Sequence, residues 1–169
     1  LAWGVILIAF ATFCVLCAGT TLGTYYFFFQ STVSLNTVLQ VGSGTIGVRD
    51  GTSAEQTETG RRPIGSGTTI RTDQIYALSQ TTVTFRDPVY DNRVVAAITL
   101  KGDTSVRLDN TQRPRFSWTS GYYNIFLTEF TGEADVTIPE GLPRDIEISI
   151  RTPQGVEILI IDSGRYIVD

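Results

Sequence analysis

The chain has 169 residues, a formal net charge of −4, and neither His nor Met. The lack of His removes the commonest general base and metal ligand, and the scattered arginines form no basic stripe that would neutralise nucleic-acid phosphates. The charges are also unevenly placed along the chain, because the first Asp, Glu, Lys or Arg is Arg49.

The N-terminal segment is apolar throughout. A helix needs about 20 mostly apolar residues to cross a hydrocarbon core of roughly 30 Å, and the uncharged run Leu1–Phe29 is longer than that. It has no polar face of the kind a soluble helix shows. Trp3 and the aromatic run 25–29 stand where interfacial belts would fall, and the apolar part of a signal peptide spans only about 7–15 residues. We expect residues 1–30 to form one transmembrane helix.

Small and aromatic side chains in this segment are the candidates for contact with other helices and with the membrane interface. Small residues let helices approach closely in a bilayer, and Tyr favours its interfaces. The candidate residues are Ala11, Thr12, Ala18, Gly19, Gly23, Tyr25 and Tyr26.

Cys14 and Cys17 form a C-x-x-C pair inside the same run. A redox pair would need an aqueous βαβ setting, and a c-type haem site would need His where Ala18 stands. A lipoprotein site would need a small residue before the acylated Cys, where Leu16 and Phe13 stand. We expect two small apolar side chains facing lipid or another helix, with palmitoylation as the alternative if one lies near an interface.

Residues 31–64 are predicted to hold connecting strands and a polar loop. The loop is the stretch 50–62, which is rich in Thr, Gly and Glu and poor in apolar residues. Gly42–Gly47 matches G-x-G-x-x-G, but a dinucleotide site needs a helix to begin there. A turn sequence, 48–52, follows instead, so we expect a turn.

Residues 65–169 are predicted to form an all-β domain. Short runs of alternating apolar and polar residues are separated by Gly, Pro, Asn and Asp, which is typical of half-buried strands. Eight or more short strands at close spacing favour an antiparallel sandwich or barrel-like fold. The expected strands are 81–85, 94–100, 103–108, 122–127, 134–138, 146–150, 156–161 and 166–168.

The order of motifs in this region resembles the extracytoplasmic FecR-like domain family. The motifs are G-S-G-T-T-I-R-T-D at 65–73, S-Q-T-T-V-T-F at 79–85, A-A-I-T-L-K-G-D-T-S-V-R-L at 96–108, I-R-T-P-Q-G at 150–155 and S-G-R-Y-I-V at 163–168. The resemblance implies a non-enzymatic β domain outside the cytoplasm, usually after one membrane helix. It further implies, for members that regulate sigma factors, a signal relayed inward.

No catalytic, cofactor or metal site is expected. Without His, a serine nucleophile would depend on Lys101, the only lysine, which precedes Gly102-Asp103 in an apparent turn. No pair of carboxylates stands out as a glycosidase pair. The loops 87–92 and 109–110 are rich in oxygen ligands for calcium, but neither follows the EF-hand spacing.

An aromatic and basic segment is the candidate docking surface. Tyr, Trp, Phe and Arg are enriched at protein interfaces, although the same rings could pack inside a strand pair. The candidate residues are Arg113, Arg115, Phe116, Trp118, Tyr122 and Tyr123.

These features predict a non-catalytic, single-pass subunit of a larger membrane complex, such as an energy-transducing or electron-transfer complex. The expected partners are other membrane-protein subunits and the lipid bilayer, with no nucleic acid and no small-molecule substrate. The expected location is the bacterial inner membrane, with the β domain on the periplasmic or extracytoplasmic side. A FecR-like signal relay is the alternative, and a membrane-anchored enzyme is disfavoured for want of a base.

Overall fold

The computed structural model describes residues 2–72 and 79–169. Leu1 of the predicted transmembrane helix and Asp73 of the motif at 65–73 lie outside the described residues. The chain divides into two compact units. We call them the helical unit, made of residues 1–33 and 114–120, and the β domain, made of residues 34–113 and 121–169.

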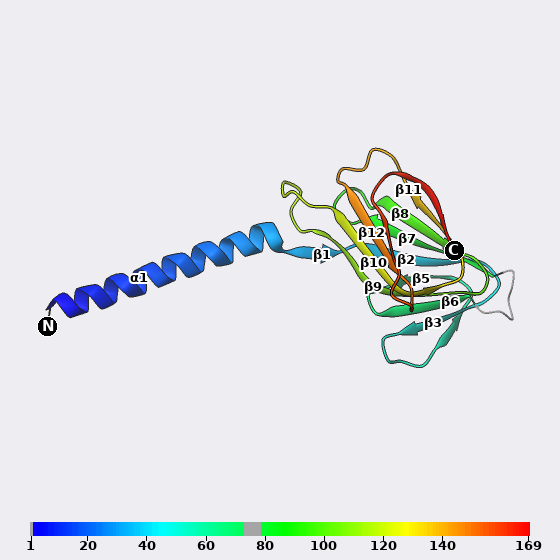
Figure 1. The fold of residues 1–169 in the computed structure, drawn as a ribbon, viewed down its shortest axis with the longest axis horizontal. Helices are drawn as coiled ribbons and strands as arrows, with labels where there is room; N and C mark the ends of the chain where they lie inside the picture. Colours follow the sequence, from blue (N-terminus) through cyan, green and yellow to red (C-terminus); the bar gives the residue numbers. More distant parts are fainter. Residues whose placement is uncertain (1, 73–78) are drawn as a thin grey trace. The chain divides into compact units, whose positions relative to one another are not determined.

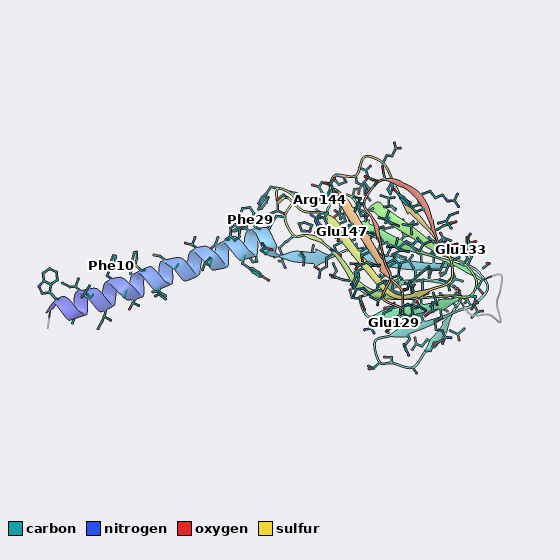
Figure 2. All side chains as sticks on the ribbon, in the orientation of Figure 1. Phe10, Phe29, Glu129, Glu133, Arg144 and Glu147 are labelled. Carbon is teal, nitrogen blue, oxygen red and sulfur yellow. The ribbon has the colours of Figure 1, made fainter. Side chains whose placement is uncertain are left out.

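The helical unit contains the predicted apolar helix. Helix α1 (Ala2–Tyr25) continues into the π-helical turn η1 (Tyr26–Gln30). The stretch Trp3–Gln30 has a mean hydropathy of 2.3 and is long and apolar enough to cross a membrane. All its side chains are exposed, and Phe10 and its neighbours stand out from the ribbon in Figure 2. This confirms one apolar helix that could span a membrane.

Three threonine hydroxyls within α1 donate to carbonyls of the helix itself. Thr12 Oγ1 donates to the carbonyl of Ile8 at 2.8 Å, and Thr21 Oγ1 donates to the carbonyl of Cys17 at the same distance. Thr20 does the same to Leu16 at 2.9 Å. A hydroxyl left without a partner in hydrocarbon is costly, so these bonds let threonine occur in the apolar stretch.

The β domain is built from two sheets, seen as layered arrows in Figure 1. Sheet A has the strand order β13-β12-β10-β9-β6-β3-β4, and sheet B has the order β14-β11-β8-β7-β2-β5. The short strand β1 (Thr32–Ser34) lies where the helical unit gives way to the β domain along the chain. The other strands are β2 (Asn36–Ser43), β3 (Ile46–Asp50), β4 (Gln56–Glu58), β5 (Arg61–Ile64), β6 (Thr68–Thr72), β7 (Gln80–Asp87), β8 (Arg93–Leu100), β9 (Thr104–Pro114), β10 (Tyr123–Thr131), β11 (Ala134–Ile138), β12 (Ile146–Arg151), β13 (Glu157–Ile160) and β14 (Gly164–Val168).

Both sheets contribute to one apolar core, so the domain is a β-sandwich. Alternate residues along each strand are buried, as in β7, where Val83 and Phe85 face inward. A small apolar gap in the core is lined by Ile70 and Leu108 from sheet A as well as by Val83 and Ile98 from sheet B. The sequence prediction of a mostly β domain after one helix is confirmed.

One pair of neighbouring strands is parallel rather than antiparallel. β10 and β12 run in the same direction, with Ile125 beside Ile148. The intervening strand, β11, belongs to sheet B and pairs with β8 and β14. The chain therefore leaves sheet A after β10 and re-enters it in the same direction, which the prediction of an antiparallel domain did not foresee.

The β domain begins earlier than the predicted boundary at residue 65. β2 lies between β5 and β7 in sheet B, and its Leu39 is fully buried. β3 places Ile46 and Val48 in the same core. The predicted polar loop 50–62 contains β4, which pairs with β3. Residues 34–64 are thus part of the sandwich.

A bulge in β9 changes which side chains face the core. Phe126 pairs with Asn110 and Leu127 pairs with Leu108, so Asp109 is an extra residue on β9. An extra residue reverses the alternation beyond it, because side chains on a strand point to opposite faces in turn. Leu108 is buried before the bulge and Arg113 is buried after it.

The β10–β11 turn depends on a glycine. Gly132 has φ +92°, and a Cβ there would lie 2.5 Å from the Asp103 carbonyl oxygen and 2.8 Å from Thr104 Cα. Gly155 has a similar φ of +87° with no atom within 4 Å of such a Cβ. We expect G155A to cost about 1–2 kcal/mol from backbone strain alone, and G132A to cost more than twice as much.

This expectation is tested by urea unfolding of the full chain in detergent micelles, followed by circular dichroism. Equal losses of unfolding free energy in G132A and G155A would contradict it, since the two positions differ mainly in the space around the added methyl group.

Candidate functional site

The predicted helix-contact residues all lie on exposed parts of the helical unit. At 100° per residue they fall within an arc of about 160° around the helix axis. Tyr25 also stacks on Phe29, with ring centroids 5.0 Å apart. Six of the residues lie in α1 and one in η1: Ala11, Thr12, Ala18, Gly19, Gly23, Tyr25 and Tyr26. Their role in helix packing stays a prediction.

Four rings from two distant parts of the sequence form an aromatic cluster. Phe116 lies 5.7 Å from Phe27 and 5.3 Å from Phe28, measured between ring centroids. Trp118 stacks on Phe116 at 4.6 Å and lies 6.4 Å from Phe28. The end of the helix and the loop 114–120 are therefore joined by ring contacts within one compact unit. We refer to these four residues as the aromatic cluster.

The loop that carries Phe116 and Trp118 is held by one backbone and one side-chain hydrogen bond. The Arg115 amide donates to the Ser31 carbonyl at 3.0 Å, and the Thr119 hydroxyl donates to the Phe116 carbonyl at 2.8 Å. The Arg115 guanidinium lies 5.6 Å from the centroid of the Phe27 ring, within the range of a cation–π contact. The loop thus presents two rings and one cation together.

Two of the six predicted docking residues are buried, which corrects the prediction for them. Arg113 and Tyr123 have no exposed surface. The bulge at Asp109 turns Arg113 inward, and Tyr123 begins the inward-facing series of β10. The other four stay accessible: Arg115, Trp118 and Tyr122 are exposed, and Phe116 is half-buried.

The buried residues form an ion pair with a third partner. Arg113 Nη1 donates to Asp87 Oδ1 at 2.6 Å, and the Tyr123 hydroxyl donates to Asp87 Oδ2 at 2.6 Å. The Val89 amide also donates to Asp87 Oδ1, at 2.8 Å. The Arg113 guanidinium lies 5.7 Å from the centroid of the Tyr90 ring. Both carboxylate oxygens of Asp87 are therefore satisfied inside the domain.

Opposing effects set the protonation of this site. Burial raises the pKa of Asp87, but the hydrogen bonds from Tyr123 and Val89 and the charge of Arg113 outweigh it, so the pKa lies below its ordinary value. Burial, followed by the hydrogen bond to Asp87, raises the pKa of Tyr123 well above its ordinary value. The carboxylate is charged and the phenol is neutral near pH 7, which suits a structural ion pair.

Other predicted candidates have ordinary surroundings. Lys101 forms an ion pair with Glu133 across the turn region. The G-x-G-x-x-G segment 42–47 joins β2 to β3 through Gly44, which has φ +74°, so a strand follows it where a nucleotide site would need a helix. No group of three or more His, Cys, Asp or Glu side chains suited to a metal lies within residues 2–72 and 79–169.

Two further surface features of the β domain could receive a partner. A hollow of about 370 Å³ is lined by Arg61, Arg86 and Asn36, among others. Elsewhere, the exposed Leu159 lies on edge strand β13 and pairs with Ser149 of β12. Ser149 in turn pairs with Phe126 of β10, so the three residues form one row across sheet A. The first feature suits an anionic group and the second an apolar one.

Comparison with known proteins gives no match: no protein-family model fits the chain, and no curated protein or solved structure is significantly similar to it. The resemblance to FecR-like domains therefore stays a prediction.

The sequence did not indicate that Asp87 would bind Arg113, nor that Phe116 would meet Phe27. Both residues lie beyond the strands expected from the sequence, since the expected strands 81–85 and 103–108 are shorter than β7 and β9. Extending the alternation of 103–108 would also have failed, because without the bulge at Asp109 it turns Arg113 outward.

We expect D87N to lower the free energy of unfolding by about 3–5 kcal/mol, because it leaves the Arg113 cation buried without a counter-charge. Y123F removes one hydrogen bond to a charged group and should cost about 1.5–3 kcal/mol. D91N, at an exposed neighbouring loop position, is the matched control. Urea unfolding of the full chain in micelles measures all three, and a D87N protein as stable as D91N would contradict the role assigned to the pair.

The depressed pKa of Asp87 also predicts a pH dependence. Stabilisation by the charged carboxylate is complete above the ordinary pKa of about 4 and is lost as the pH falls through the lower folded-state pKa. Below about pH 4, the unfolding free energy of the wild type and of D91N should therefore decrease more steeply than that of D87N. Equal slopes from unfolding curves at a series of pH values would show that Asp87 contributes nothing to acid sensitivity.

Proposed function

We propose that this protein is a non-catalytic, single-pass subunit of a larger membrane protein complex. Its helix would lie among the membrane-embedded helices, and its β domain would cover or stabilise an extramembrane partner. The partners are other membrane-protein subunits and lipid.

The observation that carries the proposal is that every described side chain of an uncharged, apolar helix is exposed. Helix α1 has 24 residues, with no acidic side chain in its first turn and no basic one in its last. All its described side chains are exposed, and Leu7, Phe13 and Leu22 each keep more than 60% of their surface. Exposing so much apolar surface to water is unfavourable, which supports a helix surrounded by lipid or protein.

Surface features of the β domain support a partner outside the bilayer. Leu159 keeps 57% of its surface exposed on an edge strand, where Phe126 supplies a second apolar side chain and Arg151 lies over its ring at 5.1 Å. Aromatic and arginine side chains are enriched at protein interfaces. Edge strands also offer unpaired backbone groups to another chain. The outer face of sheet A near β13 is thus a suitable contact for a partner protein.

The location proposed is the bacterial cytoplasmic membrane, with the β domain on the extracytoplasmic side. The support for this is the resemblance of residues 65–169 to FecR-like domains, which implies a β domain beyond one membrane helix. An energy-transducing or electron-transfer complex is the kind of assembly that we propose.

A FecR-like signal relay is the second candidate, favoured by the same arrangement of one helix and a β domain. Deletion of the gene distinguishes the two functions. Loss of a stoichiometric subunit should lower the amount of an assembled membrane complex while leaving transcript levels of its other subunits unchanged. Loss of a relay should change transcript levels of its target genes.

The membrane span predicts a clear effect of charge in α1. Each arginine at the centre of a spanning helix costs about 2.5–3.5 kcal/mol, so a protein carrying both V15R and L16R should shift largely from the membrane pellet to the soluble or aggregated fraction. The matched control carries V89R and V156R, at exposed aliphatic positions of the β domain. Fractionation with alkaline carbonate extraction measures the shift. Equal distribution of the two variants would contradict the span.

A partner is tested by purification of the native protein in mild detergent. We expect co-purification with other membrane proteins in fixed stoichiometry, and we expect L159E, but not V89E, to weaken that association. A wild-type protein that elutes alone and monodisperse from native membranes would overturn the subunit proposal.

A further inference from the structure

The aromatic cluster leaves much of its ring surface uncovered. Trp118 keeps 66% of its surface exposed and Phe27 keeps 49%, although both rings touch other rings. Aromatic rings that contact one another but stay exposed to water gain little stabilisation from the hydrophobic effect, because little of their surface is buried. At a membrane interface the same arrangement is favourable, because the apolar ring faces lipid while the indole N–H of Trp can find a polar partner.

The helical unit contains one charged side chain, which lies beside this cluster. Residues 1–33 and 114–120 include Arg115 and no Asp, Glu or Lys. Arg115 is exposed, and none of the ion pairs formed among residues 2–72 and 79–169 includes it. The guanidinium is thus available to an anion from outside the unit, and its fork geometry matches a phosphate group.

The length of the helix places the cluster at the edge of a bilayer. Trp3 and Phe27 are 24 positions apart in the sequence, which corresponds to about 36 Å at 1.5 Å per residue. A hydrocarbon core of roughly 30 Å leaves both residues just outside it, in the headgroup zone. A span that begins near Trp3 therefore ends at the rings that Phe116 and Trp118 contact.

We propose that the loop 114–120 is a lipid-binding element. The rings of Phe116 and Trp118 enter the headgroup region beside the end of the helix, and Arg115 binds the phosphate of a phospholipid there. This inference rests on the proposed function, since it requires that α1 spans the membrane. It adds a second membrane contact, made by a loop far from the helix in the sequence. The first residue of this loop, Pro114, is 84 positions after Gln30.

The two tryptophans make the inference directly measurable. The chain has Trp3 and Trp118 and no other tryptophan, so W3F leaves Trp118 as the sole reporter and W118F leaves Trp3. Each full-length variant is reconstituted into phosphatidylcholine vesicles and recovered by flotation. Tryptophan emission is then recorded with lipids brominated at shallow or deep positions of the acyl chain, and with aqueous iodide.

For W3F we expect blue-shifted emission, stronger quenching by shallow than by deep bromine, and at least several-fold protection from iodide relative to protein unfolded in urea. If the vesicles carry the protein and quench Trp3 in W118F, but Trp118 responds to iodide and to no brominated lipid, the loop does not bind lipid while the membrane span stands. If the protein does not float with the vesicles, the span itself fails.

The role of Arg115 is tested in the W3F background. R115E should shift the emission of Trp118 to longer wavelength and increase its quenching by iodide several-fold, because a carboxylate is repelled by lipid phosphate. R115K should have a smaller effect, and R61E, which introduces the same charge change in the β domain, should have none. An unchanged Trp118 signal in R115E would overturn the assignment of phosphate binding to Arg115.

Discussion

The buried carboxylate of Asp87 is the constraint on which the neighbouring strand ends of the β domain depend. It binds Arg113, the last residue of the β domain before the loop, and Tyr123, which begins the strand after it. Both stems of the loop are therefore attached to one group on β7. A charge inside a protein is tolerated only when it is paired and hydrogen-bonded, and Asp87 meets both conditions.

The general architecture was predictable because it depends on short-range patterns. The uncharged run in α1 is long enough to identify by counting, and the alternation in runs such as Gln80–Asp87 repeats at the strand period. The burial of Leu39, well before the predicted start of the domain, was missed because the polar stretch 50–62 resembled a linker. Turn-rich composition indicates loops, but it does not reveal whether the strands on either side belong to one core.

Long-range features were less accessible to sequence reasoning. The aromatic run of the helix end and the segment around Phe116 were each identified, with interfacial or docking roles, but nothing in their separate patterns indicates that they meet. The inward turn of Arg113 depends on a single inserted residue, Asp109, whose effect appears only when the pairing with β10 is known. Such bulges shift every later side chain to the other face.

The bonding of threonine within α1 has a consequence for how the helix could recognise a neighbour. Thr12 lies within the arc of the candidate contact residues, and its hydroxyl proton is engaged by a carbonyl one turn earlier. A helix that approaches this arc would therefore meet mainly small side chains, such as Gly19 and Gly23. Recognition would then follow contour rather than polarity. Such an interface would be disrupted when one helix slides or rotates against the other. It would tolerate the exchange of one apolar side chain for another of similar volume, so its specificity would depend on shape.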